Sequence, residues 1–119
     1  MRLPGEPGRG EIWSVNLDPT LGEEMGKTRP VVVVSGDTMG KLNLRVVVPL
    51  TGWQPGFRVL PWMTAIPAGS LTGLQKDSSA DGFQVSSLSL LRFKGRVGEV
   101  TEAQLKAIVE SVALVIEHE

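Results

Sequence analysis

The 119-residue sequence contains no cysteine, no tyrosine and one histidine, His118. Without cysteine, disulfide bonds and thiolate metal ligands are excluded, which fits a reducing compartment such as the cytoplasm. A catalytic pair of histidines is excluded by count. The acidic residues are scattered, with no cluster at ligand spacing. We therefore expect neither a metal site nor a cofactor.

Long apolar runs and a strong net charge are also lacking. No stretch approaches the roughly 20 apolar residues that a membrane helix needs, so we expect no membrane association. The formal net charge of −1 argues against a protein that coats long nucleic acids. Charge is uneven, however, because five cations face two acids between positions 24 and 62: Lys27, Arg29, Lys41, Arg45 and Arg58 against Glu24 and Asp37. A local basic face on a nearly neutral protein fits a short polyanion.

Length and composition predict one domain. A chain of this length that is 41% hydrophobic buries a modest core. Residues 1–8 are rich in proline and glycine without an apolar stretch, so they predict a loose N-terminal tail and not a signal peptide. The domain itself is expected over 9–119.

Strands are predicted first along the chain and one helix last. Half-buried or buried strand patterns cover 11–17, 31–35 and 44–50, and shorter candidates cover 57–62 and 84–91. The stretches 68–73 and 78–82 are interpreted as glycine- and serine-rich connections. Thr101 followed by Gln104 is a capping-box pattern, and apolar residues then recur at helical spacing up to Ile116. The predicted fold is mainly β, a small curled sheet or partial barrel with a C-terminal helix.

The most informative segment is 17–30, which a run of four valines follows at once. A glycine-containing loop delivers Lys27 and Arg29 to the start of a buried strand, and Pro30 is expected to begin that strand. The rigid sheet would fix the Arg29 guanidinium in a good position to meet an anion. The alternative is an ordinary charged loop tip beside a core strand.

The order of short motifs resembles that of the MazF/PemK-like toxin family. The chain has Gly-Glu-Ile-Trp at 10–13, Leu-Asp-Pro-Thr at 17–20, a Gly-x-Glu loop at 22–24 and Lys-Thr-Arg-Pro at 27–30. Pro-Leu-Thr at 49–51, Gly-Leu-Gln-Lys-Asp-Ser at 73–78 and Arg-Val-Gly at 96–98 continue the match. The resemblance implies an SH3-like partial barrel. It also implies a type II toxin–antitoxin toxin that cleaves single-stranded mRNA as a sequence-specific endoribonuclease, an mRNA interferase.

The available side chains agree with such a reaction. The sequence lacks a strong nucleophile at an obvious site, but RNA carries its own in the 2′-hydroxyl beside each phosphate. An enzyme then needs mainly to position that hydroxyl and to stabilise charge on the phosphorane. The resemblance implies Arg29 and Thr51 as the catalytic pair, and Arg29 is suited to bidentate contact with phosphate oxygens.

Further substrate-binding residues are expected around this pair. Lys27 is expected to contact phosphate, and Thr28 lies between the two cations of the motif. Trp53 and Phe57 flank the loop after Thr51, where they either stack on bases or simply pack. Gln84 matches a family glutamine and is expected to contact a base edge.

The chain departs from the family pattern around Gln84. Phe83 replaces the usual glutamate, and Ser-Ser-Leu-Ser at 86–89 replaces Arg-Thr-x-Asp. Arg92, Lys94 and Arg96 alternate along a strand, which is typical of a solvated face, with RNA contact as the alternative.

The resemblance also implies partners: a homodimer, a MazE-like antitoxin whose acidic tail competes with RNA, and operator DNA bound together with the antitoxin. Two alternatives stay open. One is a CcdB-like toxin that binds gyrase without catalysis, although that group depends on C-terminal aromatics and this chain has none after Phe93. The other is a silent RNA-binding or autoregulatory domain.

Overall fold

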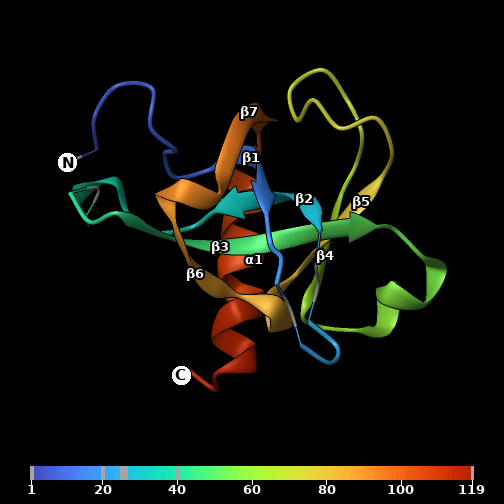
Figure 1. Ribbon diagram of the computed structural model, residues 1–119. Coiled ribbons are helices and arrows are strands. Elements are labelled where there is room, and N and C mark those ends of the chain that lie inside the picture. The colour runs from blue at the N-terminus through green and yellow to red at the C-terminus, as the bar shows by residue number, and fades with distance from the viewer. Residues whose placement is uncertain (1, 20, 25–26, 40, 119) are drawn as a thin grey trace.

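The computed structural model describes residues 2–19, 21–24, 27–39 and 41–118 (Figure 1). These residues form seven strands, four short 3-10 helices and one C-terminal α-helix. The strands are β1 (Glu11–Asn16), β2 (Thr28–Val33), β3 (Leu44–Gly52), β4 (Met63–Ile66), β5 (Ser78–Asp81), β6 (Ser86–Ser89) and β7 (Phe93–Glu99). The 3-10 helices are η1 (Asp37–Met39), η2 (Pro55–Val59), η3 (Gly82–Gln84) and η4 (Leu90–Arg92). The predicted fold class, mainly β with a C-terminal helix, is confirmed.

The strands form one antiparallel sheet in the order β4-β5-β3-β2-β1-β7, and β6 also pairs with β3. The long strand β3 joins the parts of the sheet. Its first half pairs with β6, its middle with β2, and its last three residues with β5. The residues at the end of β3 are therefore held between two neighbouring elements.

Side-chain alternation divides the core between the two faces of the sheet. On the face covered by α1 (Glu102–Val115), Val32, Val48 and Leu50 pack with Ile108 of the helix. On the other face, Val31 and Val47 pack in a second cluster, against which Trp13 is partly buried. The sheet is thus apolar on both sides, as the run of four valines predicts.

The predicted helix is confirmed in detail. The Thr101 side chain accepts a hydrogen bond from the Gln104 N–H at 3.1 Å, and the Gln104 side chain accepts one from the Thr101 N–H at 2.8 Å. Within the residues that the structure describes, no helix combines the length and the apolar character that a membrane crossing requires.

Three local predictions are wrong. Segment 57–62 is not a strand, because Pro55 begins a 3-10 helix there and the strand follows at Met63–Ile66. The serine-rich stretch 78–82 is not a mere connection, since 78–81 form the buried strand β5. Pro30 does not begin its strand but is the third residue of β2. At Pro30 the strand is paired with β1 only, because the pairing of β2 with β3 begins at Val31.

Arg45 is buried, although the sequence predicted it as part of a basic face. Its Nε donates to the Pro7 carbonyl at 2.9 Å, and its guanidinium lies 3.6 Å from the Glu6 carboxylate. Arg2 in turn forms an ion pair with Asp37 at 3.5 Å. Residues 2–8, predicted as a loose tail, therefore contact the domain through specific polar groups. Arg45 stabilises this contact and is not part of a basic surface.

Candidate functional site

Arg29 and Thr51 lie at the same end of the sheet. Arg29 is the second residue of β2 and Thr51 the eighth of β3, and both are half-buried. Val31 is paired with Pro49, so the same antiparallel register continued by two residues brings Arg29 opposite Thr51. On its other side Thr51 is paired with Ser79 of β5. Figure 1 shows the start of β2 beside the end of β3.

A cleft of about 630 Å³ opens at the start of β2, and we call it the Arg29 cleft. It is lined by Ser14, Thr28, Arg29, Pro30, Gly73, Leu74, Gln75, Lys76, Ser78 and Val97. The described lining holds two cations, Arg29 and Lys76, and no carboxylate. Its hydroxyl and amide groups are neutral hydrogen-bonding partners. The Arg29 cleft therefore has the chemistry of an anion-binding site.

Lys27 and Thr28 fix the entry into β2. Lys27 has a φ of +63°, and its N–H donates to Asp18 Oδ1 at 2.7 Å. Its carbonyl accepts the Leu17 N–H at 2.9 Å. Thr28 lines the Arg29 cleft, whereas Lys27 is exposed just outside that lining. These two hydrogen bonds of the Lys27 backbone give Arg29 a fixed starting point.

The aromatic candidates lie together beyond the end of β3. Trp53 and Phe57 line a hollow of about 250 Å³ with Arg58, whose guanidinium carbon lies 5.5 Å from the Trp53 ring centroid. The Trp53 N–H donates to the Asp77 carbonyl at 3.0 Å. Aromatic faces beside a guanidinium are suited to stacking with a nucleobase.

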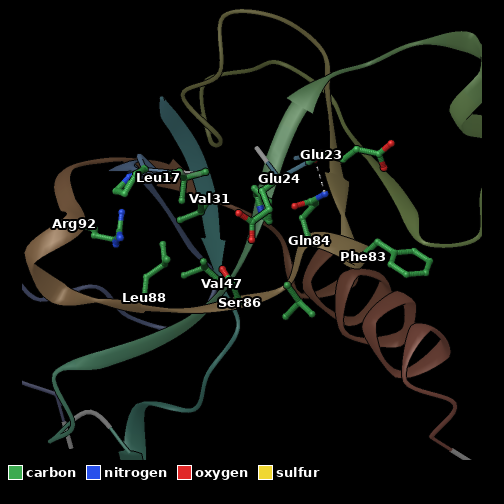
Figure 2. A pocket seen from close by; sticks show the side chains of 13 residues that line it. Leu17, Glu23, Glu24, Val31, Val47, Phe83, Gln84, Ser86, Leu88 and Arg92 are labelled. Atoms are coloured by element: carbon green, nitrogen blue, oxygen red, sulfur yellow. Dashed lines mark hydrogen bonds between the residues drawn. The ribbon is translucent and has the colours of Figure 1, made fainter. Parts of the chain in front are cut away.

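Gln84 lies apart from these groups, in a groove of about 490 Å³ on the face of the sheet opposite α1 (Figure 2). This Gln84 groove is lined by Leu17, Pro19, Glu23, Glu24, Val31, Val47, Pro49, Phe83, Gln84, Val85, Ser86, Leu88 and Arg92. Gln84 Nε2 donates to the Glu23 carbonyl at 3.3 Å, drawn as a dashed line in Figure 2. The β1–β2 loop is thereby attached to η3 across the groove.

The predicted solvated face is exposed at Lys94 and Arg96 and half-buried at Arg92, and its two arginines also contact the chain itself. Arg92 Nη1 donates to the carbonyls of Asn16 at 3.0 Å and Asp18 at 2.7 Å, which holds the root of the β1–β2 loop. Arg96 bonds to Glu11 at 3.0 Å.

Asp81 caps the short helix η3, which carries Gln84. Its carboxylate is buried, and Oδ1 accepts the Phe83 N–H at 3.0 Å, which caps η3. Burial raises the pKa of Asp81 above its usual value, against the opposing effect of the hydrogen bonds from the Phe83 and Gln84 amides. Among the described residues, no cluster of three or more His, Cys, Asp or Glu is placed to hold a metal ion.

Three residues of this region were not predicted as site residues from the sequence: Lys76, Arg58 and Asp81. Lys76 lies within the matched motif at 73–78, but nothing in the sequence shows that this segment borders Arg29. Arg58 follows Phe57 directly, so a search for cations beside the predicted aromatics would have found it. Asp81 is hidden in a stretch whose composition is typical of a loop.

Comparisons with known proteins agree with this architecture. The model of a family described as the PemK-like, MazF-like toxin of type II toxin–antitoxin systems matches residues 8–116. Endoribonuclease MazF9 of Mycobacterium tuberculosis is 37% identical over 112 residues, which cover 89% of this chain and 92% of that protein.

Solved structures with the same fold are more distant in sequence. A MazF crystal structure from Deinococcus radiodurans has a TM-score of 0.80 at 22% identity and covers 94% of this chain and 97% of its own. An endoribonuclease from a Mycobacterial species, solved in complex with its cognate antitoxin, has a TM-score of 0.74 at 20% identity. The match covers 95% of this chain and 97% of that chain.

Proposed function

Because the chain belongs to the family of PemK-like, MazF-like toxins of type II toxin–antitoxin systems, we propose that it cleaves single-stranded mRNA as a metal-independent, sequence-specific endoribonuclease. The relative with 37% identity is itself named an endoribonuclease. The observation that carries the proposal in this chain is the Arg29 cleft, where two cations and no described carboxylate face one opening.

The proposed reaction uses the nucleophile of the substrate. The 2′-oxygen bonds to phosphorus as the bond from phosphorus to the 5′-oxygen breaks. The 2′-hydroxyl loses its proton and the departing 5′-oxygen gains one, so the products carry a 2′,3′-cyclic phosphate and a 5′-hydroxyl. Arg29 stabilises the charge on the non-bridging oxygens, and Thr51 holds the same phosphate by a hydrogen bond.

Other side chains are proposed to bind the RNA on either side of this phosphate. Lys27 and Thr28 contact the backbone near Arg29, and Trp53 with Phe57 stacks on a base beside Arg58. Gln84 contacts a base edge in the Gln84 groove. This assignment is supported by where the structure places each residue.

The test of the reaction is incubation of the pure protein with a long single-stranded RNA in excess EDTA, with analysis of both product ends. We expect cleavage, with a cyclic phosphate and a 5′-hydroxyl. An RNA with 2′-deoxyribose on the 5′ side of the mapped cleavage position should stay intact. Cleavage of that deoxy-substituted RNA would overturn the mechanism.

An antitoxin is the proposed protein partner in the cytoplasm, because related toxins have been solved with theirs. We propose that its acidic tail competes with RNA for the cations around Arg29 and displaces the loop 21–28, of which residues 25 and 26 lie outside the described part. Operator DNA is a proposed ligand of the toxin–antitoxin pair only. Antitoxin affinity should fall as salt rises, and RNA should weaken it, which titration at several salt concentrations measures. An antitoxin that binds without affecting cleavage would contradict the shared site.

A further inference from the structure

Lys76 lies against the end of β3, in the connection between β4 and β5. A methyl group added at Gly52 would stand 3.3 Å from Lys76 Nζ. The ammonium therefore occupies the space that Gly52, having no side chain, leaves open. Because neighbouring residues of a strand point to opposite faces, Lys76 approaches the end of β3 from the face opposite Thr51.

Backbone contacts fix the segment that carries Lys76. Gly73, at a φ of +71°, packs so closely on β7 that a Cβ there would stand 2.1 Å from the Val97 carbonyl oxygen. On the other side of Lys76, Asp77 Oδ1 accepts the Ala68 N–H at 2.9 Å, and the Asp77 carbonyl accepts the Trp53 N–H at 3.0 Å. Little backbone ordering is then needed when Lys76 meets a ligand.

The charge of Lys76 is not neutralised within the described part of the chain. Arg2, Arg45 and Arg96 each form an ion pair there, whereas Lys76 forms none. The described lining of the Arg29 cleft, which Lys76 shares, contains no carboxylate either. An unpaired ammonium in a cleft with a guanidinium favours an anionic ligand.

We propose that Lys76 binds a backbone phosphate of the RNA in the Arg29 cleft, next to the phosphate that Arg29 and Thr51 hold. The inference rests on the proposed function and adds a residue to it. A phosphodiester suits this place because its oxygens accept hydrogen bonds from an ammonium, and because the neighbouring hydroxyl of Thr28 and amide of Gln75 provide further donors.

The test is the binding of a 2′-O-methylated copy of the RNA, which has no free 2′-hydroxyl and is not cut by the proposed reaction. Lys76→Met should weaken binding about tenfold, as expected for one charge-assisted contact. It should also reduce the slope of log affinity against log salt by about 0.7, the value for one phosphate of a single strand. Lys76→Arg should keep most of the affinity and most of the salt slope of the wild-type protein.

The control is Lys106→Met, which removes an exposed lysine from α1. Equal affinity and equal salt slope for the two methionine variants would overturn the proposal. Unchanged RNA binding by Lys76→Met together with weaker binding of an acidic peptide would also overturn it, and would assign Lys76 to a protein partner.

Gly52→Ala provides an independent test, because its methyl group would stand 3.3 Å from Lys76 Nζ and push the ammonium away from β3 by a few tenths of an ångström. The substitution should weaken RNA binding in the wild-type background and add nothing in the Lys76→Met background. Equal losses in both backgrounds would contradict the proposal.

The proposed cleavage reaction and the proposed role of Lys76 can be contradicted independently of each other. If the wild-type protein does not cleave RNA, the proposed function fails, while binding of the methylated RNA still reports on Lys76. If Arg29→Ala abolishes cleavage and Lys76→Met leaves affinity and salt slope unchanged, only the role of Lys76 is wrong.

Discussion

At the scale of single residues, the location of each arginine predicts whether it serves the fold or the site. Arg45, Arg92 and Arg96 are held by carbonyls or carboxylates of the chain itself. Arg29 lines a cleft whose described walls carry no acid. Substitutions in the first group should act on stability, and substitution of Arg29 should act on turnover.

Arg29→Ala and Thr51→Ala should each lower kcat by at least about 10², because groups that stabilise transition-state charge contribute factors of this size. Thr51→Ser, which keeps the hydroxyl, should retain much more activity than Thr51→Ala. Single-turnover cleavage of a labelled RNA measures the effect, with an unchanged Tm as the control for folding. Wild-type rates in Arg29→Ala would place the site elsewhere.

Asp81 gives a prediction on pH. Burial raises the pKa of its carboxyl above 3.8 in the folded chain, so the folded state binds this proton more tightly than the unfolded state. The resulting stabilisation is complete below the unfolded pKa and is lost as pH rises through the folded pKa. Asp81→Asn keeps Oδ1 as an acceptor for the Phe83 N–H and removes the charge. Relative to wild type, its free energy of unfolding should therefore rise with pH over this interval, as urea unfolding at several pH values measures.

At the scale of elements, Glu11 connects β1 to β7 and to residues 2–8. Its carboxylate accepts hydrogen bonds from the Gly8 N–H at 2.7 Å, the Trp13 indole at 3.1 Å and Arg96 at 3.0 Å. Burial acts to raise the pKa of Glu11, but these hydrogen bonds and the charge of Arg2 outweigh it, so the pKa lies below 4.5.

Glu11→Gln should therefore lower the free energy of unfolding by about 1 kcal/mol at neutral pH, since Arg96 is partly exposed and the solvent screens the pair. The contribution of Glu11 is present above its unfolded pKa and is lost as pH falls through the lower folded pKa. Glu99→Gln, which removes the 3.9 Å exposed partner of the same Arg96, is the matched control and should change little. Equal losses in both variants would contradict the role given to Glu11.

The elements that the sequence predicted best are those with strong local signals. The capping box of α1 and the valine run of β2 each determine their element within a few residues of chain. Strand β5 was missed because Ser78, Ser79 and Ala80 have low strand propensity, and only their burial between β3 and β4 makes them a strand. The 3-10 helix η2 was missed because Phe57 and Val59 look like strand residues, although Pro55 fixes a turn conformation before them.

At the scale of the whole molecule, the candidate site is assembled from segments far apart in the chain. Arg29 and Thr51 could be proposed from the sequence because each belongs to a recognisable motif near the end of a strand. Lys76 was not, because its position depends on the packing of the segment 73–77 against β7 and β3. The sequence therefore predicts which residue types carry the chemistry, whereas their grouping into the Arg29 cleft and the Gln84 groove follows from the topology.

The working unit is expected to be a homodimer. One small domain offers short, separate clefts of a few hundred Å³, and an RNA of several nucleotides needs a longer concave surface. Two copies related by a twofold axis provide one, and this is the commonest closed assembly. Sedimentation velocity at micromolar concentration should give twice the mass of 12.8 kDa. A monomer that cleaves RNA at full rate would exclude the shared surface.

The position of β3 has a consequence for how the chain opens in solution. This strand pairs with β2, β5 and β6, so its hydrogen bonds break only when most of the sheet separates. In amide hydrogen exchange, Val48 and Leu50 should then exchange only through global unfolding, while the loop 21–24 exchanges through local fluctuation. Thr51, at the end of such a strand, would keep its place during every motion that admits a ligand at the loop. A ligand that displaces this loop would then meet a site whose strand stays in place.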